Sequence, residues 1–100
     1  MSTGPSVTVR DNAAKSRFEA VDDSGAVAGF ATYRQRGDTV VFLHTEVDDA
    51  YEGQGVGSTL AKAALDAARK DERRVDPQCP FIRSYIDRHA EYADLVDPPT

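Results

Sequence analysis

The sequence has little cysteine, no long apolar run and no excess of positive charge. Its single cysteine, Cys79, has no companion, which excludes an internal disulfide and a cysteine-based zinc site. No apolar run approaches the ~18 residues of a membrane-spanning helix. The first six residues lack the charged start and apolar core of a signal peptide. We therefore expect a soluble, cytoplasmic protein that does not enter a membrane.

The charge balance is acidic. Twelve Lys and Arg stand against 17 Asp and Glu, which gives a formal net charge of −5. The basic cluster at residues 69–74 is interrupted by Asp71 and Glu72, as is typical of a solvated helix end. A nucleic-acid-binding protein needs several unopposed cations to neutralise phosphates. The sequence therefore argues against a nucleic acid as partner.

The chain is long enough for one small domain. Its 100 residues are 40% hydrophobic, which suffices for a single core. There is no internal repeat and no linker, so residues 1–100 are predicted to form one domain. Residues 1–6 and 97–100 are expected to be flexible tails.

β-Branched and aromatic residues predict strands in the first half of the chain. Turn-forming residues separate these strands at 11–14, 22–25 and 35–38, and short turns favour an antiparallel meander. The expected strands are Val7–Arg10, Arg17–Val21, Ala26–Arg34 and Thr39–Val47.

The second half predicts a helix, a short strand and another helix. The first helix is expected from Ser58 to about Glu72, because apolar residues recur there at helical spacing. A short strand, Arg74–Asp76, follows, and the prolines after it cannot continue a regular ladder. An amphipathic helix is expected from Phe81 to about Tyr92. Counting the three meander strands from Arg17 to Val47, with Val7–Arg10 as an additional short strand, the pattern β-β-β-α-β-α indicates one α+β domain.

A glycine-rich loop joins the last strand of the meander to the first helix. Gly53, Gly55 and Gly57 stand at alternate positions, so the backbone can turn sharply and present several N–H groups. A helix N-terminus attracts anions because of its free N–H groups and its dipole. The loop is therefore predicted to bind phosphate.

These residues resemble the GNAT superfamily of acetyl-CoA-dependent N-acetyltransferases, whose pyrophosphate loop has the pattern Gln/Arg-x-x-Gly-x-Gly/Ala. Glu52 stands where Gln or Arg is usual, so backbone geometry would have to supply the affinity. The segments 44–47, 77–81, 88–92 and 95–96 look like the small single-cysteine branch often labelled Yjdj-type. The resemblance covers roughly residues 17–96.

The resemblance implies a minimal GNAT-like fold: an antiparallel meander, a helix, a splayed strand and a C-terminal helix. It also implies acetyl-CoA or CoA as the bound cofactor. The pantetheine arm would lie beside the last strand of the meander like an added strand, and the pyrophosphate would lie at the helix N-terminus. The implied cofactor-binding residues are Thr45, Val47, Gly53, Gln54, Gly55, Val56, Gly57 and Ser58.

Three side chains besides the cysteine are candidates for catalysis. Alternation along a strand places Phe42, His44 and Glu46 on one face, where His44 and Glu46 could take a proton from an amine. The alternative is a His44 that is hydrogen-bonded inside the sheet and a Glu46 that is solvated. Tyr85 lies near the place where many GNAT enzymes carry a tyrosine that protonates the departing thiolate. The alternative for Tyr85 is packing in the core.

Cys79 is the fourth catalytic candidate. Pro80 suits a first helical turn, so Cys79 should cap the last helix, where the dipole favours a thiolate. Such a thiolate could accept an acetyl group or form a mixed disulfide with CoA. The alternative is an inert, buried cysteine.

Two other functions compete with acetyl transfer to an amine. A dinucleotide-binding fold could use Asp76 as its ribose ligand, but the strands turn back through hairpins, and Leu60 stands at the third glycine position. A non-catalytic CoA-binding module that acts through protein interaction stays open, because the helices that cover the acceptor side of larger GNAT enzymes are missing. The favoured prediction is that an amine attacks the acetyl thioester directly. This amine would belong to a protein lysine, to a protein N-terminus or to a small molecule. The sequence does not indicate an oligomeric state.

Overall fold

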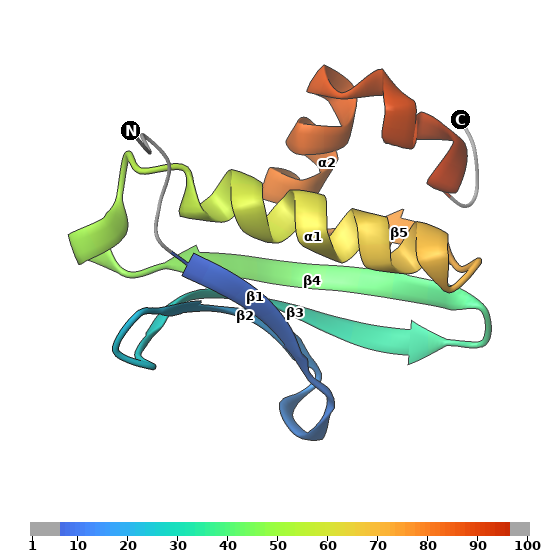
Figure 1. The fold of residues 1–100 in the computed structure, drawn as a ribbon. Helices are drawn as coiled ribbons and strands as arrows, with labels where there is room; N and C mark the ends of the chain where they lie inside the picture. The colour runs from blue at the N-terminus through green and yellow to red at the C-terminus, as the bar shows by residue number, and fades with distance from the viewer. Residues whose placement is uncertain (1–6, 97–100) are drawn as a thin grey trace.

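The computed structural model describes residues 7–96, which form a five-stranded sheet with both α-helices on one side (Figure 1). The predicted tails, 1–6 and 97–100, lie outside the described residues. The elements are β1 (Val7–Asn12), η1 (Ala13–Lys15), β2 (Arg17–Asp22), β3 (Val27–Arg36), β4 (Thr39–Val47), η2 (Asp49–Tyr51), α1 (Val56–Lys70), β5 (Arg74–Pro77), α2 (Pro80–Arg88) and η3 (Ala90–Leu95), where η marks a 3-10 helix.

The strands lie in the sheet in chain order, from β1 to β5. The first four are antiparallel, and β5 is parallel to β4 because α1 carries the chain back across the sheet. This confirms the predicted α+β class and meander. β1 and β3 run two residues beyond their predicted ends, because Asn12 pairs with Arg17 and Arg36 pairs with Thr39. Cross-strand pairing there outweighs local turn propensity.

The core lies between the sheet and the helices. α1 buries Val56, Leu60, Ala64 and Leu65, and its small alanines let it lie close to the strands. α2 and η3 extend the same core, because their buried side chains pack with those of α1 and with Phe42. Along residues 7–96, no helix covers the opposite face of the sheet (Figure 1).

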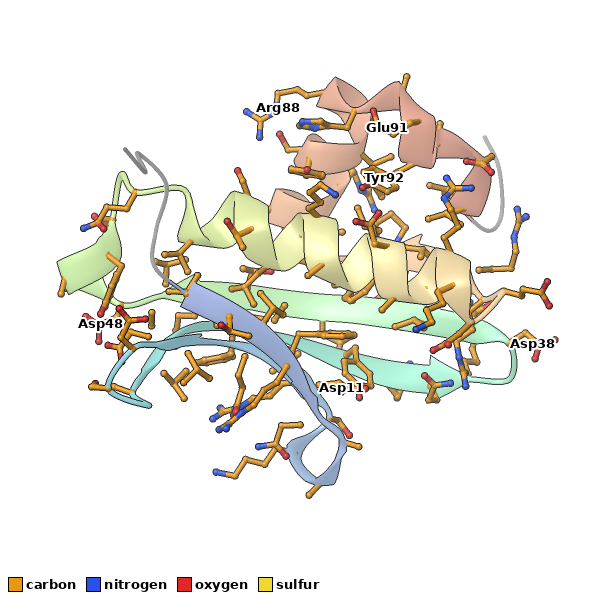
Figure 2. The ribbon with its side chains drawn as sticks, in the orientation of Figure 1. Asp11, Asp38, Asp48, Arg88, Glu91 and Tyr92 are labelled. Atoms are coloured by element: carbon orange, nitrogen blue, oxygen red, sulfur yellow. The ribbon has the colours of Figure 1, made fainter. Side chains whose placement is uncertain are left out.

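The predicted helix from Phe81 to Tyr92 is wrong in its last turn. α2 ends at Arg88, and His89 adopts φ −130° and ψ 80°, which break the helix. The His89 ring donates from Nδ1 to the Tyr85 carbonyl. In a continuing α-helix this carbonyl would instead accept the backbone N–H of His89. Tyr92 then turns toward α1, where its hydroxyl donates to Asp66 at 2.6 Å (Figure 2). Packing against α1 therefore overrides the helical pattern.

A β-bulge interrupts β4 at Leu43. His44 pairs with Thr32, but Phe42 pairs with Tyr33, so Leu43 is an extra residue on β4. The prediction that Phe42 shares a face with His44 and Glu46 is therefore wrong. Phe42 is 1% exposed in the core, whereas the side chains of His44 and Glu46 are 61% and 62% exposed on the uncovered face.

Candidate functional site

β4 and β5 part halfway along β4. They pair from Thr39 and Arg74 to Phe42 and Pro77, and the Cys79 N–H then donates to the Phe42 carbonyl at 2.8 Å. Beyond that bond the chain turns away into α2. Residues 43–47 of β4 therefore have no neighbouring strand on this side within the described part of the chain. The result is an open strand edge inside a sheet.

The bulge decides which backbone groups face the open edge. The Asp48 N–H donates to the Ala28 carbonyl on β3 at 2.8 Å. Since backbone direction alternates along an antiparallel strand, the N–H groups of His44 and Glu46 also point toward β3. Those of Thr45 and Val47 point to the open edge. Without the extra residue, this alternation would be reversed beyond Phe42.

The glycine loop depends on its glycines for two different reasons. Gly53 and Gly55 have φ of 80° and 81°, a region that other residues rarely adopt. Gly57 lies within α1, and a Cβ there would meet the Phe81 ring at 2.8 Å. Asp at Gly57 would therefore disturb the packing of α1 on α2, and it cannot report on phosphate binding alone.

α1 begins at Val56, two residues earlier than predicted, with Gly55 as its N-cap. The N–H groups of the first three helical residues, 56–58, have no intrahelical acceptor and are available to an anion. The Gln54 N–H is not available in the same way, because it donates to the Tyr51 carbonyl at 3.2 Å. Of the predicted phosphate-binding N–H groups, that of Gln54 is therefore excluded. Those around Gly53 and at residues 56–58 remain.

A hollow of about 250 Å³ lies in front of this helix N-terminus. One wall belongs to Val47 at the end of the open edge, and another belongs to Phe81 of α2. The lining contains no Lys or Arg, and its one charged residue is Glu52. Attraction for an anion must therefore come from backbone N–H groups and the helix dipole. The lining residues are Val47, Tyr51, Glu52, Gly53, Gly55, Val56, Gly57, Ser58 and Phe81.

Cys79 lies at the base of the gap between β4 and α2. It is the N-cap of α2, with Pro80 in the first turn, as the sequence predicts. Its Sγ lies 3.3 Å from Thr45 Oγ1, within hydrogen-bonding distance, and the residue is 2% exposed. The thiol is therefore packed beside the open edge of β4, against the side chain of Thr45.

His44 and Glu46 form a pair on the uncovered face, with Nε2 and Oε1 3.4 Å apart. The Phe30 ring meets His44 edge-on at 6.5 Å, and the Arg17 guanidinium lies 4.5 Å from the centre of that ring. His44 is thus not enclosed in the sheet, which was one predicted alternative. The pair and Cys79 lie on opposite faces of the same strand edge, so a reactant could approach this edge from either side.

Tyr85 lies in the core between α2, α1 and η3. Its ring stacks on His89 at 3.9 Å and lies 6.1 Å from that of Tyr92. Burial raises the pKa of Tyr85, so the phenol stays protonated at neutral pH. It does not line the hollow at the glycine loop. This placement supports the packing alternative rather than proton donation beside Cys79.

A buried carboxylate, Glu19, lies on the uncovered face of the sheet, and no motif in the sequence indicates it. Glu19 is 1% exposed because two arginines lie over it. Arg17 Nε donates at 2.7 Å, Arg10 Nε at 2.9 Å and Asn12 Nδ2 at 3.2 Å. The Arg17 hydrogen bond lowers the pKa of Glu19 to about 2 against the opposing effect of burial, with help from Arg10 and Asn12.

This network predicts a pH-dependent stability. Because the pKa of Glu19 is lower in the folded than in the unfolded chain, its contribution is present above about pH 4.5 and is lost as the pH falls toward about 2. Glu19→Gln should cost about 1–3 kcal/mol at pH 7, because it removes charge-assisted hydrogen bonds. Urea denaturation of both proteins at pH 7 and pH 2.5 measures the difference. An equal difference at both pH values would contradict the assignment.

None of the helices that the structure describes is long and apolar enough to cross a membrane. Among residues 7–96, no group of three His, Cys, Asp or Glu side chains is placed to hold a metal ion.

Known proteins are similar to this chain in sequence and in fold. Residues 17–95 match the family described as GCN5-related N-acetyl-transferase. Protein NATD1 of Mus musculus and that of Homo sapiens are each 36% identical over 69 residues, or 66% of this chain. The match spans 63% and 61% of those proteins, less than two thirds of their length. An NMR structure of a Staphylococcus aureus protein described as GCN5-like has a TM-score of 0.70 at 26% identity, covering 91% of this chain and 88% of that one.

Proposed function

The chain belongs to the GCN5-related N-acetyltransferase family, and we propose that it binds acetyl-CoA and transfers the acetyl group to an amine. The observation that carries the proposal is the open edge of β4 leading directly to the glycine loop. Val47 belongs to both the edge and the hollow in front of α1. An extended, amide-bearing chain that ends in phosphates fits this combination. Acetyl-CoA has that composition, and it would supply an activated acetyl thioester.

The residues present fit such a ligand in two places. The outward N–H groups of Thr45 and Val47 would bond the amide-bearing arm as a neighbouring strand does. The free N–H groups of residues 56–58, with the helix dipole, would hold the pyrophosphate. The positive φ of Gly53 and Gly55 supports this assignment, because it brings bare backbone to the mouth of the hollow.

His44 and Glu46 are the proposed proton acceptors. Their 3.4 Å separation and their exposure let them take a proton from an incoming amine, directly or through water. They face the side of the sheet that no described helix covers. That open face favours an amine presented on a bulky acceptor, such as a protein lysine or N-terminus, although a small amine also fits.

Cys79 has a separate proposed role. Its thiol lies against Thr45, at the base of the gap, where it could accept the acetyl group before the amine does. The arrangement of one buried cysteine at the cap of α2 also supports the finer assignment to the single-cysteine, Yjdj-type branch of the family.

The proposed role of Cys79 is tested by replacing it with alanine. CoA affinity should stay within about threefold, because the arm would bond to the backbone of β4. Acetyl transfer should fall about tenfold, and the acetyl adduct on the protein should be lost. Intact-mass analysis after incubation with acetyl-CoA detects the adduct, and Cys79→Ser controls for the size of the side chain. Unchanged turnover in both variants would make Cys79 a packing residue.

A non-catalytic CoA-binding module is the second candidate. The observation in its favour is the same uncovered face, because residues 7–96 provide no helix to enclose an acceptor. The two candidates differ in one result. An acetyltransferase releases free CoA when a suitable amine is added, whereas a binding module retains acetyl-CoA intact with every amine offered.

A further inference from the structure

Tyr51 ends η2 and stands directly before the glycine loop. It lines the hollow in front of α1. Its hydroxyl donates to Asp22 Oδ2 at 2.6 Å, at the turn between β2 and β3. The loop is thus connected to a turn 29 residues earlier in the chain.

Asp22 is a firmly held acceptor. Its Oδ1 receives the Ser24 N–H at 2.9 Å, the Ser24 hydroxyl at 2.6 Å and the Ala26 N–H at 3.0 Å. These bonds, led by that of the Ser24 hydroxyl and followed by that of Tyr51, hold the pKa of Asp22 well below its usual range. Tyr51 therefore donates to an ionised carboxylate, which makes a stronger bond than a neutral acceptor does.

The main chain of Tyr51 links this bond to the loop. Its N–H donates to the Asp48 carbonyl at 2.8 Å, and its carbonyl accepts the Gln54 N–H at 3.2 Å. Asp48 in turn donates to Ala28 on β3. The loop that follows contains three glycines and loses more backbone entropy on ordering than other sequences do. Fixing Tyr51 before a ligand arrives lowers that cost.

We infer that Tyr51 is a positioning residue for phosphate binding: its hydrogen bond to Asp22 holds the glycine loop so that the N–H groups at the start of α1 face the pyrophosphate of CoA. The inference rests on the proposed function, because CoA is the ligand that the loop positions. Tyr51 takes no part in acetyl transfer.

The test is Tyr51→Phe, which removes only the hydroxyl. The Kd for CoA should rise about five- to tenfold, the loss expected for one such hydrogen bond. The Kd for pantetheine, which lacks the phosphates, should change less than twofold in an NMR-detected titration. Tyr92→Phe is the matched control, because it removes a hydroxyl that donates to Asp66, also at 2.6 Å, on the far side of α1. It should leave the Kd for CoA unchanged.

Hydrogen exchange of the ligand-free protein separates this inference from the proposed function. The amides of Gln54 and Thr59, which donate to the Tyr51 and Gly55 carbonyls, should exchange about fivefold faster in Tyr51→Phe than in the wild type or in Tyr92→Phe. Equal losses of CoA and pantetheine affinity, or no loss with unchanged exchange, would overturn the positioning role. A wild-type protein that does not bind CoA would overturn the proposed function and the phosphate role together. Exchange would then still show whether the bond holds the loop.

Discussion

Gly53→Asp is expected to abolish most CoA binding, whereas Gly53→Asn should not. Gly53 has open space around the position of a Cβ and φ of 80°, so both substitutions fit sterically with the same backbone strain. They differ only in a negative charge at the mouth of the hollow. Repulsion of the pyrophosphate should weaken binding by about 2–3 kcal/mol, or roughly 30- to 150-fold. Calorimetric titration with CoA measures both variants.

The comparison is informative because the pair shares every effect except charge. Both variants should unfold cooperatively and at similar temperatures, which circular dichroism verifies. The extra loss in Gly53→Asp should shrink as salt concentration rises, since screening weakens exposed charges. Equal CoA affinities of the two variants would mean that no phosphate lies at the glycine loop.

Glu46→Gln is expected to lower kcat about a hundredfold. Glutamine has the shape of glutamate but cannot accept a proton, and loss of a general base typically costs 10²–10⁴-fold. The KM for acetyl-CoA should change less than twofold, because the Glu46 side chain lies on the uncovered face and its N–H points toward β3. Steady-state kinetics with a responsive amine measures both constants.

Glu91→Gln is the matched control for this substitution. Glu91 is an exposed carboxylate on η3, beyond α1 from the sheet (Figure 2). Its replacement should leave kcat and KM unchanged. A Glu46→Gln enzyme with normal kcat would assign Glu46 to the solvated surface and leave His44 or water as the proton acceptor.

The junction of β4, the glycine loop and α1 could be predicted from sequence because its signals are local. β-Branched residues end at Val47, and glycines with a phosphate-loop spacing precede an alanine-rich helix. The parting of β4 and β5 was also expected from the prolines, but it comes one residue later than predicted, because Pro77 still pairs with Phe42 and the strands separate only between Pro77 and Pro80. These features depend on residues that are close together in the chain.

Features that depend on distant partners were not predictable. The bulge at Leu43 arises from the register between β3 and β4. Beyond it, each side chain of β4 lies on the face opposite to the one that uninterrupted alternation would give. The break at His89 depends on packing of Tyr92 against α1. The hydrogen bond from Tyr51 to Asp22 joins two turns that are 29 residues apart in the chain, and no sequence motif links them. Such contacts leave no mark in the spacing of apolar residues along the chain.

The bulge has the largest functional consequence of these. It turns the backbone N–H groups of Thr45 and Val47 toward the open edge. It also places the side chains of His44 and Glu46 on the face of the sheet that the helices do not cover. One extra residue thus separates the proposed binding groups from the proposed proton acceptors. A donor and an acceptor molecule could then meet across β4 without competing for the same surface.

An NMR titration of the ¹⁵N-labelled protein with CoA tests the central claim most directly. We expect the largest amide shifts at Thr45, at Val47 and in residues 53–58. A larger hollow, of about 330 Å³, lies along the C-terminal half of α1, with Phe18 and Tyr33 in its lining, and it should show no change. Shifts confined to that second hollow, or no shifts at all, would contradict a CoA site at the open edge of β4.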